Sequence, residues 1–243
     1  MAKFYVISDV HGFYDEMKKA LDDAGFDPND ENHWLVSLGD ELDRGDQSQE
    51  VLDYLLGLPR AIFVKGNHTL LMEEMLNRGY ARSHDVSNGT FKAACDLAPN
   101  ATDMFEAVPV IWSKVKPLFD KEINYLELKN HILVHSFVPL KSLDGRKFEK
   151  DPNWRYAHAS AWEEAVWGNP YQLAEQGLLP DKTLVFGHFH TSWPRHHYEG
   201  KPEFGEGADF SIYHGDGYIA IDGCVAYSGR VNVLVLEDVF MDG

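Results

Sequence analysis

Cysteine is scarce in this chain. Only Cys95 and Cys224 occur in 243 residues, and neither belongs to the paired spacing of a metal or redox motif. The sequence therefore gives no sign of a disulfide framework. Both side chains are expected to behave as small hydrophobes in a reducing, cytoplasmic setting.

Basic residues are also few. The chain carries 22 Lys and Arg against 39 Asp and Glu, which gives a formal net charge of −17. Binding to nucleic-acid backbones needs clustered cationic side chains, so general nucleic-acid binding is not expected. A phosphorylated substrate stays compatible with this charge, because bound metal ions can make one site locally positive.

Long apolar runs, internal repeats and flexible linkers are missing from the sequence. No apolar stretch reaches the length of a membrane span, and the N-terminal residues lack a signal-peptide pattern, so no membrane partner is expected. The length and the 44% hydrophobic content predict a globular protein with a substantial core. We expect residues 1–243 to form a single domain, and nothing in the composition defines its oligomeric state.

The first third of the chain alternates short apolar runs with helical patterns. Strands are predicted for three runs, at 4–8, 33–39 and 61–66. Apolar residues at helical spacing, bounded by Gly and Pro, predict helices at 13–25, 47–59 and 68–79. Gly79 is the expected C-cap of the last helix. This alternation predicts a parallel sheet covered by helices on both faces.

The remainder of the chain has a different pattern. Residues 80–120 are expected to form short helices and loops that cap one end of the domain. The later part is rich in strand patterns, with a hairpin around Lys129 and Asn130, a buried strand in 183–190 and two or three strands in 217–238. A second sheet packed on the first follows, so the expected fold is α/β, with a two-sheet β-sandwich core flanked by helices.

Metal-binding residue types follow five of the predicted strands. These strand ends supply, in order, Asp9 and His11; Asp40, Asp43 and Arg44; Asn67 and His68; His135; and His188 with His190. Each residue alone is explained as well by a turn or a helix cap. Chemistry in open α/β sheets gathers at the carboxyl ends of strands, so the set as a whole predicts a shared metal site. The mixture of His, Asp and Asn suits Mn, Fe or Zn better than Ca or Mg.

The motifs "SDVHG", "GDELDRG" and "GNH", followed by "LVHS" and "FGHFHT", identify a family. In this order they resemble the phosphoprotein phosphatase branch of the calcineurin-like metallophosphoesterases, in particular the compact bacterial and phage serine/threonine phosphatases. The resemblance covers nearly the whole chain, and "GDELDRG" is its most specific element. It implies a four-layer αββα arrangement and a centre of two divalent metal ions, with Mn preferred and Fe, Zn or Ni as alternatives.

The same resemblance implies roles for individual residues. Asp40 would bridge the two metals, and the other ligands would be Asp9, His11, Asn67, His135 and His188. His68 would be the general acid, Asp43 would orient it, and Arg44 would bind the phosphate. A carboxylate suits the bridging position because it offers two oxygens, and two metals can share a hydroxide and hold a phosphate for in-line attack.

The sequence departs from the family pattern at three places. Thr69 stands where relatives have an acid after "GNH". Gly168 and Asn169 stand where relatives have a phosphate-binding arginine, and Arg155, Arg195 or Arg146 could replace it. The expected substrate contacts are Arg44, Asn67 and Asn169. His190 is an expected additional metal ligand, because "GHFH" is the form found in the wider superfamily.

Three functions are compatible with these features. The first is a phosphomonoesterase that hydrolyses phosphoserine or phosphothreonine by direct attack of a metal-bridging hydroxide. The alternative is a dinucleoside polyphosphate hydrolase, or a phosphoesterase or phosphodiesterase of broad specificity on small nucleotides. A binding module without activity is disfavoured, because every expected ligand is present. Glu41 and Asp46 are expected on the solvent side, and "NGT" at 88–90 is expected to have no role in the site.

Overall fold

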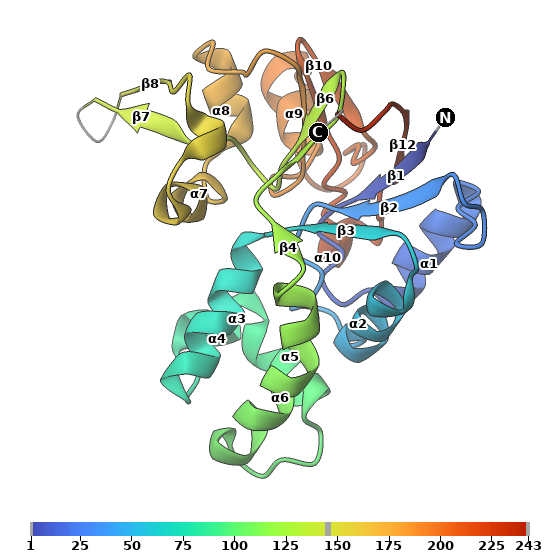
Figure 1. Cartoon of the computed structure of the whole chain (residues 1–243), viewed down its shortest axis with the longest axis vertical. Coiled ribbons are helices and arrows are strands. Elements are labelled where there is room, and N and C mark those ends of the chain that lie inside the picture. The colour runs from blue at the N-terminus through green and yellow to red at the C-terminus, as the bar shows by residue number, and fades with distance from the viewer. Residues whose placement is uncertain (1, 144–146, 242–243) are drawn as a thin grey trace.

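The structure is a computed structural model that describes residues 2–143 and 147–241 (Figure 1). Its elements up to residue 119 are β1 (Lys3–Ile7), α1 (Tyr14–Asp23), β2 (His33–Ser37), α2 (Ser48–Gly57), β3 (Ala61–Val64), α3 (Asn67–Arg78), α4 (Ser83–Asn88), α5 (Thr90–Leu97) and α6 (Met104–Phe119). The elements that follow are β4 (Glu122–Ile123), β5 (Leu126–Glu127), β6 (His131–Leu133), β7 (Leu140–Ser142), β8 (Phe148–Lys150), a 3-10 turn (Trp154–Tyr156), α7 (Ala159–Ala165), α8 (Pro170–Glu175), β9 (Thr183–Phe186), α9 (Ser192–Glu199), β10 (Tyr213–Gly215), β11 (Tyr218–Ala220), α10 (Val225–Ser228) and β12 (Leu234–Glu237). None of the helices in the described ranges is both long and apolar enough to cross a bilayer.

Two five-stranded sheets form the centre of the molecule. The first has the order β12-β1-β2-β3-β4, in which β1 to β4 run parallel and β12 runs antiparallel to β1. The second has the order β10-β11-β9-β6-β5, with a parallel core of β11, β9 and β6 and an antiparallel strand at each edge. The predicted hairpin at Lys129 and Asn130 is present between β5 and β6.

Side-chain alternation along the strands shows how the sheets pack. In β1, Tyr5 and Ile7 contact the cluster formed with the helices, whereas Phe4 and Val6 contact the other sheet. In β9, Val185 faces the first sheet, and its neighbours Leu184 and Phe186 face the outer side. A strand buried on both faces is apolar throughout, so its sequence cannot tell whether a helix or a sheet covers each face.

The fold prediction is therefore confirmed as an α/β fold with a two-sheet core flanked by helices. The narrower expectation that helices cover both faces of the first sheet is wrong. Helices cover only one face, because the second sheet occupies the other and closes an apolar layer between them. This layer places the carboxyl ends of β1, β2 and β3 near those of β6 and β9.

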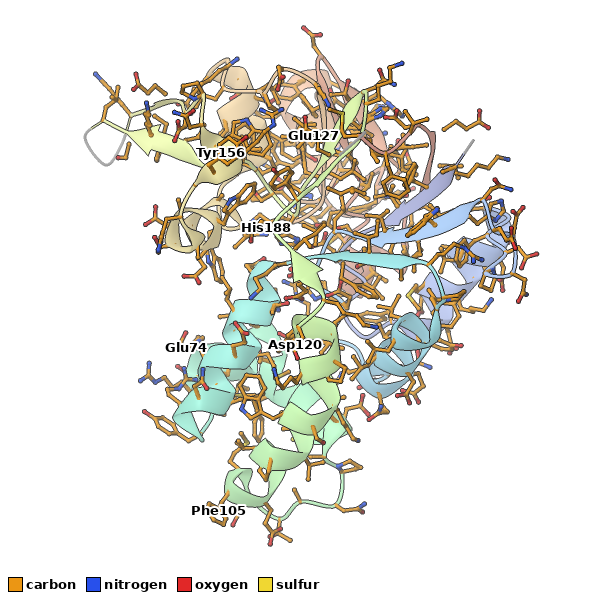
Figure 2. The ribbon with its side chains drawn as sticks, in the orientation of Figure 1. Glu74, Phe105, Asp120, Glu127, Tyr156 and His188 are labelled. Atoms are coloured by element: carbon orange, nitrogen blue, oxygen red, sulfur yellow. The ribbon has the colours of Figure 1, made fainter. Side chains whose placement is uncertain are left out.

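Residues 80–120 form three helices, of which α5 and α6 pack with α1, α2 and α3 in one cluster. The helix α6 is longer than expected, at 16 residues, and includes Pro109 and Pro117. Asp103 fixes its start, because its side chain accepts a hydrogen bond from the Glu106 amide at 3.0 Å. Phe105, near that start, lies far from the centre of the molecule, where His188 is found (Figure 2).

The outer face of the second sheet is covered by α7, α8 and α9 with many aromatic side chains. Tyr171 is fully buried there and stacks on Trp193 with ring centroids 5.1 Å apart. Residues 217–238, expected to hold two or three strands, form β11, the short helix α10 and β12. The helix begins because Cys224 adopts a left-handed φ of 52° and its amide donates to the Asp222 carboxylate at 2.7 Å.

Candidate metal centre

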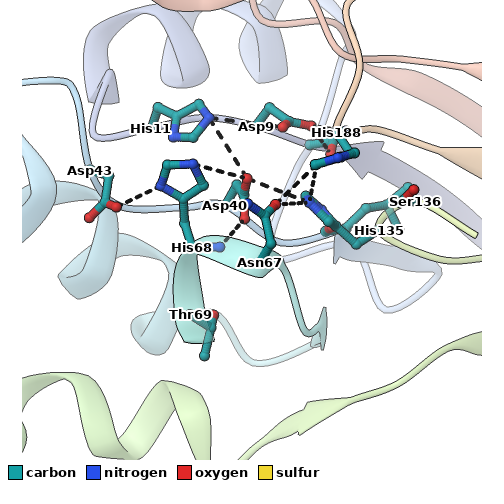
Figure 3. A network of polar contacts seen from close by, with 12 residues as sticks. Asp9, His11, Asp40, Asp43, Asn67, His68, Thr69, His135, Ser136 and His188 are labelled. Carbon is teal, nitrogen blue, oxygen red and sulfur yellow. Dashed lines mark hydrogen bonds and ion pairs between the residues drawn. The ribbon is translucent and has the colours of Figure 1, made fainter. Parts of the chain in front are cut away.

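The polar strand ends meet at one edge of the two-sheet core, as the sequence predicts (Figure 3). Asp9 and His11 follow β1, Asp40 follows β2, and Asn67 begins α3 after β3. His135 and His188 come from the second sheet, just after β6 and β9. Their side chains are gathered from both sheets, so the centre forms only when the sandwich is closed.

Backbone strain is concentrated at this edge. Among the described residues, seven non-glycine residues have positive φ, and six of them were expected in the site: Asp9, His11, Asp40, Asp43, Arg44 and His188. Such conformations cost about 1–3 kcal/mol each and persist only where the surroundings enforce them. These backbone conformations therefore lower the stability of the fold, but they direct the side chains into the site.

Close backbone approach explains Gly66, which lies directly beside Asp40. A Cβ atom built there would lie 2.2 Å from Asp40 Oδ1 and 2.7 Å from the Asp40 amide nitrogen. No side chain fits that space, so only glycine allows the chain between β3 and α3 to run directly beside the Asp40 turn.

One group of potential ligands consists of His11, Asp40 and His68. The Nε2 atom of His11 lies 3.9 Å from Asp9 Oδ1 and 3.9 Å from Asp40 Oδ2. Its other ring nitrogen, Nδ1, donates to the Leu42 carbonyl at 3.0 Å, because a carbonyl can only accept. The lone pair of His11 therefore lies on Nε2 and faces the two carboxylates.

A second group consists of Asp40, His135 and His188, with Asn67 beside it. His135 Nδ1 donates to the Leu38 carbonyl at 2.7 Å, which turns Nε2 toward Asp40 Oδ2 at 3.5 Å. The same Nε2 lies 3.2 Å from His188 Nδ1, and the Asn67 carbonyl oxygen lies within 3.0 Å of both nitrogens. Asp40 belongs to both groups, so it is the residue that could bridge two ions.

The charge states suit metal binding. Burial, with the nearby positive charge of Arg44, lowers the pKa of His11 well below its usual range. Burial and His135 lower the pKa of His188 to about 3. Burial raises the pKa of Asp40, but His135, His68 and His11 outweigh it and hold that pKa well below its usual range. Neutral imidazoles and an ionised carboxylate that point lone pairs at one another fit divalent cations.

The predicted acid, His68, is held beside this centre. Its Nδ1 atom lies 2.6 Å from Asp43 Oδ2, and its backbone amide donates to Asp40 Oδ1 at 3.0 Å. Burial lowers the pKa of His68, but Asp40 and Asp43 outweigh it and raise the pKa above the usual value. The exposed Arg44 places Nη2 3.3 Å from His68 Nε2, so the predicted acid and the predicted phosphate-binding group lie side by side.

Two expected site residues make other contacts. His190 lies outside both ligand groups; its Nδ1 is 2.9 Å from the Ser192 hydroxyl, and its Nε2 is 3.3 Å from Glu203 Oε1. Asn169 uses its side-chain oxygen to cap α8, accepting from the Tyr171 and Gln172 amides. Their roles in metal and substrate binding remain predictions.

The arginine that was expected to replace the missing phosphate ligand is not found among the described candidates. Arg155 forms a bidentate ion pair with Glu127 at 2.7 and 2.8 Å. Arg195 is buried and donates to the carbonyls of Thr191, Ser211 and Ile212. Arg146 lies outside the described residues. Arg44 is thus the arginine that the structure places at the centre.

Two acids near the centre, Glu41 and Glu122, have buried side chains that the sequence does not predict. The expectation that Glu41 faces solvent is therefore wrong. Glu41 is 2% exposed and accepts a hydrogen bond from the Ser37 hydroxyl at 2.6 Å. Glu122, on β4, accepts from Thr69 at 2.7 Å, while its other oxygen lacks a hydrogen-bond partner. Burial, followed by the charge of Glu41, raises the pKa of Glu122. The resemblance leads one to expect an acid at the position of Thr69, and Glu122 brings a carboxyl to the Thr69 hydroxyl from β4.

A third acid, Asp222, lies in the range 217–238, for which the sequence predicts only strands. Its carboxyl is buried, and burial followed by the charge of Asp9 raises its pKa well above the usual range. No sequence signal marks these acids, because isolated Glu and Asp residues are mostly exposed in proteins.

Removal of the bridging charge should abolish stabilisation by metal. Saturating Mn²⁺ at about 100 times its dissociation constant is expected to stabilise the wild type by about 2.7 kcal/mol. Asp40→Asn should lose this gain, because a neutral amide cannot balance two cations. Thermal melts with Mn²⁺ and with a chelator measure the difference, and Asp46→Asn, an exposed acid nearby, is the matched control. An equal Mn²⁺-induced shift in Asp40→Asn would contradict the assignment.

Glu41 should make the metal-free protein lose stability as pH rises. Burial, with the charge of Asp40 adding to it, raises its pKa from 4.5 to about 7. Between these values the unfolded chain binds fewer protons than the folded one, so the free energy of unfolding falls with rising pH. Glu41→Gln removes this titration and should gain up to about 3 kcal/mol on the wild type across that window.

Urea unfolding at several pH values, in chelator, measures this effect. Glu31→Gln, at an exposed position, is the control and should follow the wild type throughout. A pH-independent difference between Glu41→Gln and the wild type would show that Glu41 does not titrate in this range.

The chain is similar in sequence to a known family and to several known proteins. The calcineurin-like phosphoesterase family matches residues 2–213. A symmetrical bis(5'-nucleosyl)-tetraphosphatase of Proteus mirabilis (strain HI4320) is 43% identical over 135 residues, which are 55% of this chain and 44% of that protein. A protein of the same name from Psychromonas ingrahamii (strain DSM 17664 / CCUG 51855 / 37) is 26% identical over 192 residues, 78% of this chain and 58% of that protein. The chain thus spans about half the length of these relatives.

Solved structures agree at the level of the fold. A protein serine/threonine phosphatase from Saccharomyces cerevisiae superposes with a TM-score of 0.52 at 14% identity, covering 100% of this chain and 81% of that one. An identity this low carries the architecture and not the substrate. The family match extends over most of the chain and includes all the strand ends that meet at Asp40. The chain belongs to the calcineurin-like phosphoesterase family.

Proposed function

We propose that this protein hydrolyses a phosphate ester or anhydride with two divalent metal ions. The observation that carries the proposal is that Asp40 belongs to both groups of potential ligands. Asp9 and His11 would complete one metal site, and Asn67, His135 and His188 the other. When bound, two divalent ions would polarise the phosphate and supply a nucleophile at neutral pH, and we propose Mn²⁺ as the preferred ion.

The protein's own side chains would do the remaining work. Arg44 would bind a phosphate oxygen with its exposed guanidinium. His68 would give its Nε2 proton to the leaving oxygen, and Asp43 would stabilise the charged imidazole through Nδ1. The raised pKa of His68 supports this role, because it keeps the proton available near neutral pH.

We propose a dinucleoside polyphosphate as the substrate class. The relatives reported above, named as symmetrical bis(5'-nucleosyl)-tetraphosphatases, support this choice. The structure is compatible with such a substrate. Arg155 is paired with Glu127 and Arg195 with backbone carbonyls, so Arg44 is the arginine that lies at the centre among these described candidates. A substrate with several phosphate groups can contact the protein at more than one of them, so its binding does not rest on a pair of arginines around a single phosphoryl group.

Phosphoserine or phosphothreonine in a protein is the second candidate substrate. The buried pair of Asp43 and His68 favours it, since alkoxide leaving groups need a proton. A nucleotide leaving group is less basic and depends less on an acid.

We also propose a cytoplasmic location and a single domain over the whole chain. The two free cysteines support a reducing, cytoplasmic setting.

A panel of substrates run with Mn²⁺, Ni²⁺, Zn²⁺ and Mg²⁺ tests the proposal. Diadenosine tetraphosphate is expected to be turned over faster than a phosphothreonine peptide or bis-p-nitrophenyl phosphate, with the highest rate in Mn²⁺. His68→Asn should lower kcat by about 10²–10⁴ on substrates with poor leaving groups. His197→Asn replaces an exposed histidine that stacks on Trp193 and is the matched control, expected to match the wild type.

The outcomes separate the two substrate classes. Faster turnover of the phosphopeptide would contradict the nucleotide assignment and favour phosphoserine or phosphothreonine in proteins as the substrate. No hydrolysis of any of the three compounds with any of the four metals would overturn the proposed function as a whole.

A further inference from the structure

Thr90 makes a buried hydrogen bond to the side chain that holds the proposed acid. It is the first residue of α5 and is 0% exposed. Its hydroxyl donates to Asp43 Oδ2 at 2.6 Å, and the same oxygen lies 2.6 Å from His68 Nδ1. Thr90 belongs to the "NGT" run, for which the sequence suggests no role in the site.

The chain is built to bring this hydroxyl to Asp43. Gly89, just before Thr90, has a φ of 86°, and a Cβ atom there would lie 2.4 Å from the Arg44 amide nitrogen. Lys92, two residues after Thr90, donates to the Arg44 carbonyl at 2.9 Å. The junction of α4 and α5 therefore packs directly against the turn that carries Asp43 and Arg44.

This contact matters because, among the described residues, only Thr90 and His68 form hydrogen bonds with the Asp43 carboxylate. Its second oxygen, Oδ1, is buried and has no hydrogen-bond partner. The terminal torsion of an aspartate is broad, so the side chain alone does not hold one oxygen toward the imidazole. The two hydrogen bonds to Oδ2 define its orientation, and one of them comes from Thr90.

We infer that Thr90 is a positioning residue for the proton transfer, because its hydroxyl holds Asp43 Oδ2 against His68. The inference rests on the proposed function. Without the hydroxyl, the carboxylate can turn and His68 loses its fixed partner, so the proton on Nε2 is delivered less well to the leaving oxygen. The helices α4 and α5 would then stabilise the position of the acid, His68.

Dependence of the rate on the leaving group tests the inference. In the Mn²⁺-loaded protein, Thr90→Val is expected to lower kcat about tenfold for phenyl phosphate, whose poor leaving group needs the acid. For 2,4-dinitrophenyl phosphate the loss should stay below about twofold, since that leaving group departs without a proton. Thr90→Ser keeps the hydroxyl and should restore the phenyl phosphate rate.

A merely structural role would lower both rates equally, and that result would overturn the inference, as would a wild-type leaving-group dependence in Thr90→Val. Thr90→Ala is measured in parallel and carries the comparison if the Val variant does not fold. Thr102→Val makes the same change at an exposed position, where the hydroxyl donates to Glu106, and should leave both rates unchanged. If the wild type hydrolyses neither the aryl phosphates nor diadenosine tetraphosphate, the proposed function fails; if it turns over any of them and Thr90→Val follows the wild type, only the role of Thr90 fails.

Discussion

His11 and His135 each donate one ring nitrogen to a backbone carbonyl and direct the other toward a site that already contains the Asp40 and Asp9 carboxylates and the Asn67 carbonyl. Acceptors that face one another without donors between them repel, and burial strengthens that repulsion. Backbone carbonyls hold two of the rings in this orientation, at Leu42 for His11 and Leu38 for His135. Divalent cations at the centre of this arrangement would attract all of these groups and so offset their repulsion. The surrounding elements hold the groups in the positions that such cations require.

The rest of the structure serves this convergence. Two sheets must close on each other before His135 and His188 reach Asp40, and the apolar layer between the sheets provides the driving force. The strained backbone at the strand ends and the space that admits only Gly66 show that precise aim is retained at a cost in stability. The α4–α5 junction adds a third support, because Thr90 and Lys92 form hydrogen bonds with the turn that carries Asp43 and Arg44.

Much of this could be predicted from the sequence, for physical reasons that differ by element. Strands β1, β2 and β3 and their helices have strong periodicity, and sites in parallel sheets form at the carboxyl ends of the strands, so both the elements and the place of the site could be predicted. The burial of Glu41 and Glu122 could not be predicted, because the contacts that bury them come from distant segments. Thr90 was missed for the same reason: its partner, Asp43, lies 47 residues away in the chain. Periodicity also could not tell which face of β1 meets the second sheet.

The central claim is that two metal ions share Asp40. Anomalous diffraction at the manganese absorption edge, from crystals grown with Mn²⁺, tests it directly. The account predicts two peaks about 3.5–4 Å apart on either side of the Asp40 carboxylate, one toward Asp9 and His11 and the other toward His135 and His188. A single peak, or two peaks that do not share Asp40, would contradict it.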